Sequence, residues 1–240
     1  MRIMTEPVSQ QRLRLRDEFL DRAAEELFKY DERLRGLDLQ VRFDRGVAHL
    51  TGEVGERAHL DTARELIGWL DGVFGVWDRV RVGGRDPLIL DLGCGSQKQY
   101  PGNLGVDLMA TGEVDVVADL SGPLPFADSC ADRVFLVHIL EHLIDFLPLV
   151  DEVHRVLRPD GIAYVLSPWW RYVNAVADPT HVRMLDVQTI KGICRRPGSS
   201  RTWFPLHADC DGASIFAELR PVKDGSAEAP GAPHLARFFD

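Results

Sequence analysis

The first 85 residues alternate between hydrophobic and polar positions in patterns that predict helices and strands. From residue 16 to 35, hydrophobic side chains recur every three or four positions, as in an amphipathic helix: Phe19, Ala23, Leu27, Tyr30 and Leu34. Strict alternation, typical of half-buried strands, follows. We expect a helix at 16–35, strands at 37–43 and 47–54, a helix at 56–70 and a strand at 73–82. This order predicts a small α+β domain at residues 17–85, preceded by an N-terminal arm at 1–16.

The remaining chain alternates short hydrophobic strands with helical segments and loops. Strands are expected at residues 88–92, 103–107, 114–119, 132–138, 161–166, 201–206 and 214–222. A helix is expected at 145–157, where Pro148 falls in the first turn. This alternation predicts an α/β domain at residues 86–223, built on a doubly wound, mostly parallel sheet with helices on both faces. Residues 225–233 are rich in Ala, Gly and Pro, so we expect the tail 224–240 to be disordered.

The amino-acid composition and net charge of the chain indicate which kinds of binding partner and which cellular compartment to expect. The chain has 240 residues, 45% hydrophobic and 27% charged, as in soluble globular proteins, and its formal net charge is -9. This acidic balance argues against a nucleic-acid partner, because phosphate binding relies on Lys and Arg. No stretch resembles a signal peptide or a membrane span, and the four cysteines are scattered. We therefore expect a reduced, cytoplasmic protein.

The stretch Leu88-Ile89-Leu90-Asp91-Leu92-Gly93-Cys94-Gly95 indicates a ligand site. It consists of a short hydrophobic strand that runs into a loop with Gly at alternate positions. Glycine permits a sharp backbone turn and lets a ligand approach the main chain without meeting a Cβ atom. In an open parallel sheet, ligands bind at the carboxyl ends of the strands, where this loop is expected.

Five motifs in family order give this domain a resemblance to class I S-adenosylmethionine-dependent methyltransferases, of the methyltransferase type 11 kind, over residues 87–190. They are Asp91-Leu92-Gly93-Cys94-Gly95 with Asp107 after it, Val117-Ala118-Asp119-Leu120, Leu124-Pro125-Phe126-Ala127-Asp128, Leu140-Glu141-His142-Leu143, and the segment 152–161. The loop lacks the third Gly of the dinucleotide fingerprint, which disfavours a nicotinamide enzyme. The resemblance implies a Rossmann-like fold and S-adenosyl-L-methionine as cofactor.

The resemblance also implies cofactor contacts. The expected cofactor-binding residues are Asp91, Gly93, Cys94, Gly95, Asp107, Leu108, Asp119, Leu120 and His138. The backbone at residues 93–95 would accept the methionyl portion, while Asp91 orders the loop or meets the ammonium group. Asp107 would accept both ribose hydroxyls as a bidentate acceptor. Asp119 suits the adenine amino group. The usual helix between the second and third strands is missing, because only about seven residues follow Asp107 before strand three.

The acceptor side offers histidines and aromatic residues. Trp169, Trp170 and Tyr172 could line an apolar or planar acceptor, and Arg183 could contact an anion. If the methyl acceptor must lose a proton, a positioned base is needed. We expect His142 and His181 as catalytic candidates, against a purely structural role for each. The stretch His138-Ile139-Leu140-Glu141-His142 resembles a divalent-cation site of ubiquinone-biosynthesis O-methyltransferases, but His replaces the first Glu. We therefore predict no metal, and keep His138, Glu141 and His142 as weak candidates.

Residues 18–83 resemble the BON domain in Val47–Val54 and Leu70–Val80. Such domains are associated with phospholipid or hydrophobic-ligand contact, so residues 17–85 are expected to contact a membrane surface or a protein partner. The sequence favours a cytoplasmic methyltransferase acting on the O or N atom of a small-molecule or lipid-linked acceptor. Two alternatives stay open: a non-catalytic cofactor-binding protein whose BON-like domain does the docking, and a nicotinamide- or nucleotide-sugar-binding enzyme.

Overall fold

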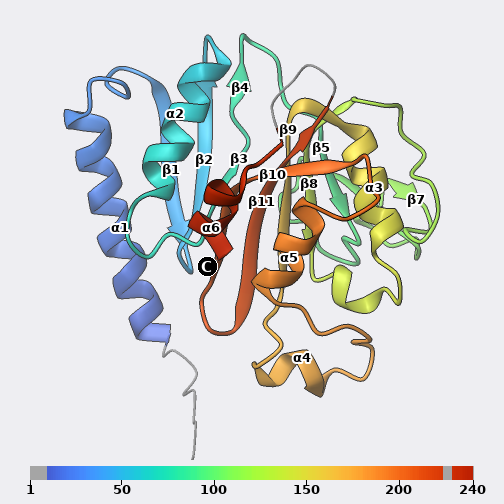
Figure 1. Cartoon of the computed structure of the whole chain (residues 1–240). Helices are drawn as coiled ribbons and strands as arrows, with labels where there is room; N and C mark the ends of the chain where they lie inside the picture. Colours follow the sequence, from blue (N-terminus) through green and yellow to red (C-terminus); the bar gives the residue numbers. More distant parts are fainter. Residues whose placement is uncertain (1–9, 224–228, 240) are drawn as a thin grey trace, which may run out of the picture. The chain divides into compact units, whose positions relative to one another are not determined.

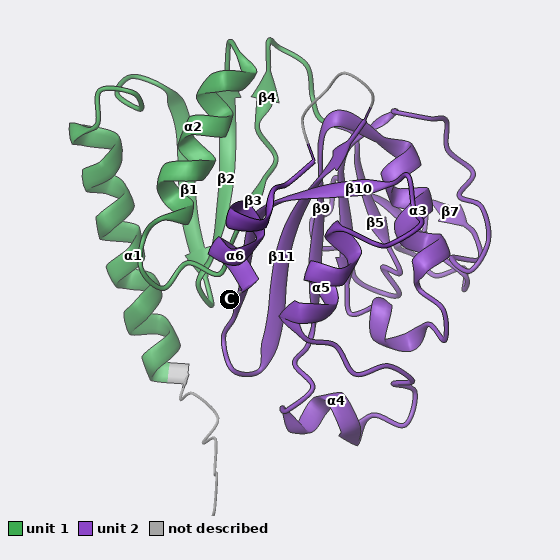
Figure 2. Cartoon of the chain, in the orientation of Figure 1, with its two compact units in different colours: residues 1–87 green, residues 88–240 purple. Residues whose placement is uncertain are grey.

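The computed structural model describes residues 10–223 and 229–239. The chain divides into two compact units, Met1–Pro87 and Leu88–Asp240, coloured separately in Figure 2. Each is described by itself. Among the described residues, no helix is both long enough and apolar enough to cross a membrane.

Unit 1 is a four-stranded sheet with two helices. Its elements are α1 (Gln10–Tyr30), β1 (Asp38–Asp44), β2 (Val47–Val54), α2 (Arg57–Gly68), β3 (Gly75–Asp78) and β4 (Arg81–Val82). The central strand β2 pairs antiparallel with β1 and parallel with β3 and β4. The expected third strand is therefore two short strands that pair successively with β2. The predicted order of elements is otherwise observed.

Two expectations about the first helix were wrong. The helix begins at Gln10, inside the stretch predicted to be an arm, whose residues 1–9 lie outside the described part. Its buried face carries Leu20 and Ala24, whereas Phe19 and Tyr30, predicted to face the core, are 64% and 62% exposed. Both faces have hydrophobic residues at helical spacing, so periodicity alone could not choose between them.

The rotation of α1 is fixed by hydrogen bonds to the β1–β2 turn. The two carboxylate oxygens of Asp17 accept hydrogen bonds from the backbone N–H groups of Arg45 and Gly46, both at 2.8 Å. Arg45 and Gly46 have positive φ angles of 51° and 79°, so this turn is tight. Asp17 and Leu20 are three residues apart and share one face of the helix. The carboxylate that caps the turn therefore brings Leu20 to the core.

Unit 2 contains a seven-stranded sheet in the order β10-β11-β9-β8-β5-β6-β7 (Figure 1). The strands are β5 (Ile89–Leu92), β6 (Leu104–Asp107), β7 (Val116–Val117), β8 (Ala131–Val137), β9 (Leu157–Pro168), β10 (Thr202–Cys210) and β11 (Ser214–Val222). Strands β5 to β9 pair in parallel, and β11 runs antiparallel to both β9 and β10. This mixed, parallel-rich sheet confirms the predicted fold class.

The helices of unit 2 are η1 (Leu140–His142), α3 (Leu147–Val156), α4 (Val173–Ala177), α5 (Val187–Cys194) and α6 (Ala232–Phe239). Residues of α3, α5 and α6 share one hydrophobic core with alternate residues of β5, β8, β9 and β11. Pro148 falls in the first turn of α3, as predicted.

The expectation of helices on both faces of this sheet was wrong. In the described chain no helix forms between β5 and β8, because these connections are too short and too rich in turns. This extends the predicted loss of the helix after Asp107. On the second face, Tyr100 packs edge-on against Phe135 with ring centroids 5.7 Å apart. Phe135 in turn contacts Tyr164.

The predicted disorder of residues 224–240 was also wrong for the end of the chain. Residues 232–239 form α6, which buries Leu235 and Phe239 in the core. The His234 ring lies 4.1 Å from the Phe204 ring, and its Nε2 atom lies 2.8 Å from the carbonyl oxygen of Pro205. Residues 224–228 lie outside the described part. Composition indicated disorder because Ala, Gly and Pro surround a short amphipathic segment.

Candidate active site

The carboxyl ends of four parallel strands bring the predicted cofactor residues to one edge of the sheet. Leu92 of β5 pairs with Val106 of β6 and with Leu136 of β8. Asp107 pairs with Val117 of β7. The loop 93–95, Asp107, Asp119 and His138 each follow or end one of these strands, so the register places them along a single edge.

The two glycines of the loop have different surroundings. Both have positive φ, 69° at Gly93 and 55° at Gly95. A Cβ atom on Gly93 would lie 1.9 Å from Cδ1 of Ile139, whereas one on Gly95 would meet no heavy atom within 4 Å. Gly93 is therefore required for packing inside the protein. Gly95 borders open space, where a ligand can approach the backbone.

Asp91 is an internal support of this loop. Its side chain is 1% exposed, and its Oδ2 atom accepts hydrogen bonds from the Gln99 backbone at 2.5 Å and from the Asn103 amide at 3.2 Å. Burial raises the pKa of Asp91, and the bonds from Gln99 and Asn103 oppose that rise. Of its two expected roles, the geometry supports the ordering of the loop.

Asp107 holds the loop from the neighbouring strand and stays accessible. Its Oδ2 atom accepts a hydrogen bond from the Gly95 backbone at 2.9 Å, and its Oδ1 atom accepts one from Met109 at 3.0 Å. Each carboxylate oxygen can accept a second hydrogen bond, so two ribose hydroxyls could be bound together. Leu108 is 64% exposed and offers an apolar surface beside this carboxylate.

Asp119 lies at the end of the same edge. Hydrogen bonds from the Ser121 hydroxyl at 2.6 Å and its backbone N–H at 2.8 Å lower the pKa of Asp119. The exposed carboxylate is thus anionic and suited to an amino group. Leu120 is buried in the core, so its side chain anchors the loop and only its backbone remains for a ligand.

These residues fit the implied cofactor. Open space beside Gly95 leaves room at the backbone, and two accessible carboxylates stand at successive strand ends. Hydroxyl and amino groups are the donors that such carboxylates bind. The Cys94 side chain is buried and turned to backbone carbonyl groups, so Cys94 offers its main chain only.

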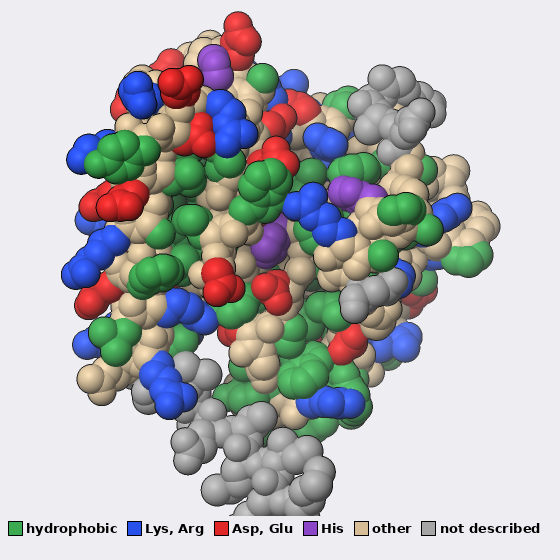
Figure 3. Space-filling view, turned by 60° about the vertical axis from the view of Figure 1, so that its left-hand side comes forward, with side chains coloured by type: hydrophobic (Ala, Val, Ile, Leu, Met, Phe, Trp, Pro, Cys, Tyr) green, Lys and Arg blue, Asp and Glu red, His purple; other side chains and the backbone are tan. Residues whose placement is uncertain are grey.

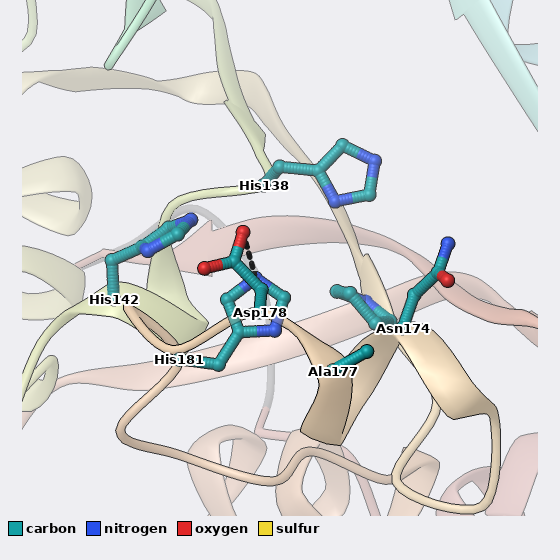
Figure 4. A pocket seen from close by; sticks show the side chains of 7 residues that line it. His138, His142, Asn174, Ala177, Asp178 and His181 are labelled. Atoms are coloured by element: carbon teal, nitrogen blue, oxygen red, sulfur yellow. Dashed lines mark ion pairs between the residues drawn. The ribbon is translucent and has the colours of Figure 1, made fainter.

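A cavity of about 440 Å³ adjoins this edge at the end of β8 and β9 (Figure 4). Its lining residues are His138, His142, Pro168, Asn174, Ala177, Asp178 and His181. Figure 4 shows His138, at the end of β8, across from Asp178 and His181, which follow α4. The structure therefore joins the predicted cofactor residue His138 to both predicted catalytic histidines.

The segment after α4 is attached to η1. The carbonyl oxygen of Glu141 accepts hydrogen bonds from the backbone N–H groups of Val182 and Arg183, at 2.9 and 3.1 Å. Nδ1 of His142 lies 3.3 Å from the carbonyl oxygen and 3.1 Å from the hydroxyl of Thr180. The rings of His142 and His181 meet edge to face, 4.7 Å apart. This backbone pairing sets the position of both imidazoles.

Other residues expected around the acceptor have structural partners. The indole N–H groups of Trp169 and Trp170 both donate to Oδ2 of Asp186, at 2.8 and 3.0 Å. Arg183 donates to the carbonyl oxygen of Ile144. Trp169, Trp170 and Arg183 were predicted to contact the acceptor, but none of them is among the described residues that line the cavity.

Glu141, His142 and His181 could offer one metal-ligand atom each, all within 4.8 Å of one another among the described residues. The Glu141 carboxylate is 1% exposed, and both its oxygens already accept hydrogen bonds from protein side chains. The arrangement therefore favours hydrogen bonding over ion coordination.

The motif Leu124–Asp128 proves to be structural. The Arg155 guanidinium donates to the carbonyl oxygens of Leu124 and Phe126 and to the carboxylates of Asp128 and Glu152. Glu152 also accepts a hydrogen bond from the Leu124 backbone at 2.8 Å. Two of the five motifs thus form one network that fixes the loop between β7 and β8.

Two lining or supporting residues were missed by sequence reasoning. Ser167 is fully buried at the end of β9 and donates to Glu141 at 2.9 Å. Ser167 could have been noticed in the sequence, because it is a polar residue at the end of a hydrophobic strand. Asn174 lines the cavity from α4, and its surroundings in the sequence carry no comparable signal.

Comparisons with known proteins match both units. Residues 90–165 match the model of the methyltransferase domain, and residues 17–84 match the BON domain. Both predicted resemblances are thereby confirmed, and with them S-adenosylmethionine as the cofactor that the methyltransferase domain implies. No curated protein sequence matches the chain.

Solved structures similar to the chain include methyltransferases. A SAM-dependent methyltransferase from Aquifex aeolicus is 14% identical over 57% of this chain and 82% of its own, with a TM-score of 0.44. A TehB-like enzyme from Corynebacterium glutamicum is 19% identical over 56% and 79%, with a TM-score of 0.41. In a complex of the Haloferax volcanii Trm112 methyltransferase activator with a methyltransferase, the matching chain is 15% identical over 57% of this chain and 83% of its own length. Its TM-score is 0.41.

Proposed function

We propose that this chain, which carries a methyltransferase domain behind a BON domain, transfers a methyl group to the O or N atom of a small-molecule or lipid-linked acceptor. The observation that carries the proposal is the position of His138. It ends a strand beside the Gly93–Gly95 loop and also lines the histidine cavity. The cofactor edge and the space for an acceptor therefore adjoin.

The size and lining of the cavity support a small polar acceptor. About 440 Å³ falls within the usual range of small-molecule sites, roughly 300–1,000 Å³. Three imidazoles, an amide and a carboxylate line it, so hydroxyl and amino groups would find partners there. The net charge of -9 supports a partner other than nucleic acid.

The protein's own residues would bind and align the reactants. S-adenosylmethionine supplies an electrophilic methyl group on a sulfonium centre. Asp107 would hold the ribose and Asp119 the adenine. His142, from η1, and His181, from the segment after α4, would contact the acceptor in the cavity. Alignment and exclusion of water account for most catalysis in such a displacement.

Titration calorimetry of the full chain with S-adenosylhomocysteine tests the cofactor site. We expect micromolar binding, reduced at least tenfold in Asp107→Asn, because one anionic acceptor is lost. Asp61→Asn, a change of the same kind on the exposed surface of α2, is the control and should bind like the wild type. Absence of binding by the wild type would refute the proposal. Tritiated cofactor incubated with cell extract would then identify the methylated acceptor.

A second candidate function is a non-catalytic cofactor-binding protein that docks through unit 1. Its support is a set of exposed apolar residues on α1, Leu15, Phe19 and Tyr30. Figure 3 shows hydrophobic side chains among interspersed positive and negative ones on one face of the molecule. This mixture suits a neutral membrane surface or a protein better than an anionic membrane.

Vesicle sedimentation of the full chain distinguishes the two docking partners. If unit 1 binds lipid, the protein should pellet with phosphatidylcholine vesicles, and Phe19→Ser with Tyr30→Ser should abolish this. Glu25→Ser, on the same helix, is the control. Failure of the wild type to pellet would leave protein docking as the role of this face.

Cytoplasmic localisation is supported by the cysteines. Cys94, Cys130, Cys194 and Cys210 are all unpaired. Burial raises the pKa of the Cys194 thiol to about 12, so this group is unreactive in the folded protein. Free thiols are typical of reducing compartments.

A further inference from the structure

His138 has a backbone conformation that is uncommon for residues other than glycine. Its φ angle is 55°, in the left-handed region, and its N–H donates to the carbonyl oxygen of Leu166 at 2.8 Å. Non-glycine residues in this region are strained and cluster at functional sites. The conformation directs the half-exposed His138 side chain into the cavity, as Figure 4 shows.

A buried carboxylate holds one nitrogen of this imidazole. Oε1 of Glu141 lies 3.1 Å from Nδ1 of His138, while Oε2 accepts a hydrogen bond from the Ser167 hydroxyl at 2.9 Å. Burial opposes ionisation of Glu141, but the hydrogen bonds from His138 and Ser167 outweigh it and keep the pKa of Glu141 below its usual value. An anionic carboxylate accepts only, so Nδ1 of His138 must carry the proton.

In the neutral form of the His138 ring, Nε2 is then the unprotonated nitrogen, and the half-exposed side chain lines the cavity. No hydrogen bond among the described residues uses this atom. The other two cavity imidazoles have no buried carboxylate partner among the described residues: Nδ1 of His142 contacts Thr180, and Nδ1 and Nε2 of His181 lie near Ala175 and the exposed Asp178. His138 is therefore the imidazole best arranged to receive a proton.

We propose that His138 is the general base toward the methyl acceptor, and that Glu141 and Ser167 are positioning residues that fix its tautomer. This rests on the proposed methyl transfer, and it names the acceptor class as a hydroxyl compound that must lose a proton. The acceptor oxygen forms a bond to the methyl carbon while the carbon–sulfur bond breaks and its electron pair returns to sulfur. The acceptor proton passes to Nε2 of His138 and later to water.

Nitrogen-15 spectra of the histidine rings test the positioning role without any acceptor. In the full chain near pH 8, His138 should show the fixed Nδ1–H tautomer. Glu141→Gln removes the charge at constant shape and should convert this signal to a tautomer mixture. Ser167→Ala should weaken it less, because the carboxylate remains. The exposed His59 on α2 serves as an internal reference that should not change. A wild-type His138 protonated at Nε2 would overturn the proposal.

Kinetic variants test the role of His138 as a base. With tritiated cofactor and cell-extract acceptors, His138→Gln should lower the transfer rate about 100-fold, the usual size of general-base catalysis. Its affinity for S-adenosylhomocysteine should stay within about threefold of wild type, measured by calorimetry. Equal losses of rate and affinity would instead make His138 a cofactor contact and refute the base. Full activity of His138→Gln in a chain that binds the ligand would refute this inference alone, whereas no binding by the wild type would refute the methyltransferase function.

Discussion

The two glycines of the cofactor loop allow a matched pair of substitutions. Gly93 and Gly95 have similar positive φ angles, 69° and 55°, so Ala at either position meets the same backbone penalty. Only at Gly93 does the new methyl group clash, with the Ile139 side chain at 1.9 and 2.2 Å. Any difference between Gly93→Ala and Gly95→Ala therefore reports the packing against Ile139 and not the turn itself.

The expected magnitudes follow from these contacts. A left-handed conformation destabilises the folded state by about 1–2 kcal/mol for an L-residue. Replacing Gly by Ala also lowers the conformational entropy of the unfolded chain, which offsets about 0.4–1 kcal/mol of that loss. Gly95→Ala should thus lower the free energy of unfolding by about 1 kcal/mol or less. Gly93→Ala adds an overpacking penalty of about 1–3 kcal/mol, for a total of about 1–4 kcal/mol.

Urea unfolding followed by tryptophan fluorescence measures these values, and amide hydrogen exchange at residues 89–92 and 104–107 localises the loss to the loop's neighbours. The double variant Gly93→Ala with Ile139→Ala should be less unstable than the sum of its single variants by about 1–3 kcal/mol, because the clash is relieved. In binding, Gly95→Ala should weaken S-adenosylhomocysteine despite its near-normal stability. Equal destabilisation by the two alanines, or additivity in the double variant, would refute this reading of the loop.

Other expected outcomes concern groups outside the cavity. Arg155→Met should lower the free energy of unfolding of unit 2 by about 2–4 kcal/mol. The carbonyl oxygens of Leu124 and Phe126 and the Glu152 carboxylate would lose their hydrogen-bond donor. Arg155 lowers the pKa of Glu152, so this deficit should shrink as the pH falls below the ordinary Glu value and Glu152 is protonated. Burial lowers the pKa of His154, whose contribution to stability is full above pH 6.5 and lost as the pH falls; a His154→Gln variant should lose that slope in urea unfolding. Asp17→Ala should destabilise unit 1 by about 1–3 kcal/mol, measured by the same unfolding experiment, because two turn N–H groups lose their acceptor.

The strand-end acids were predictable because their signals are local. Asp91, Asp107 and Asp119 each follow a short hydrophobic run, and parallel pairing brings the ends of such runs to one edge. The parallel pairing of the central strands and the absent helix after Asp107 follow from the same pattern and from connection length. These features need no knowledge of side-chain contacts.

Features that depend on contacts between distant segments were not predictable from the pattern. The buried face of α1 depends on Asp17 reaching a turn 28 residues away. The roles of Trp169 and Trp170 depend on the Asp186 carboxylate, which both indoles share. Because they lie near the expected acceptor site in the sequence, Trp169 and Trp170 were predicted to line that site. In the structure their polar N–H groups needed an acceptor, and that need decided their orientation.

The segment from His138 to His142 shows how a short turn separates the roles of adjacent residues. Glu141 and His142 are neighbours in sequence, which suggested one shared site for a proton or an ion. The single turn of η1 sends the Glu141 side chain inward, where it is 1% exposed, and leaves His142 half-buried at the cavity. Residues three apart lie on the same face of such a turn, so the partner of Glu141 is His138. The left-handed φ of His138 completes this pairing, because it returns the side chain at the strand end toward the turn that follows. The strain at His138 and the burial of Glu141 are thus two parts of one arrangement that fixes the His138 ring at the cavity.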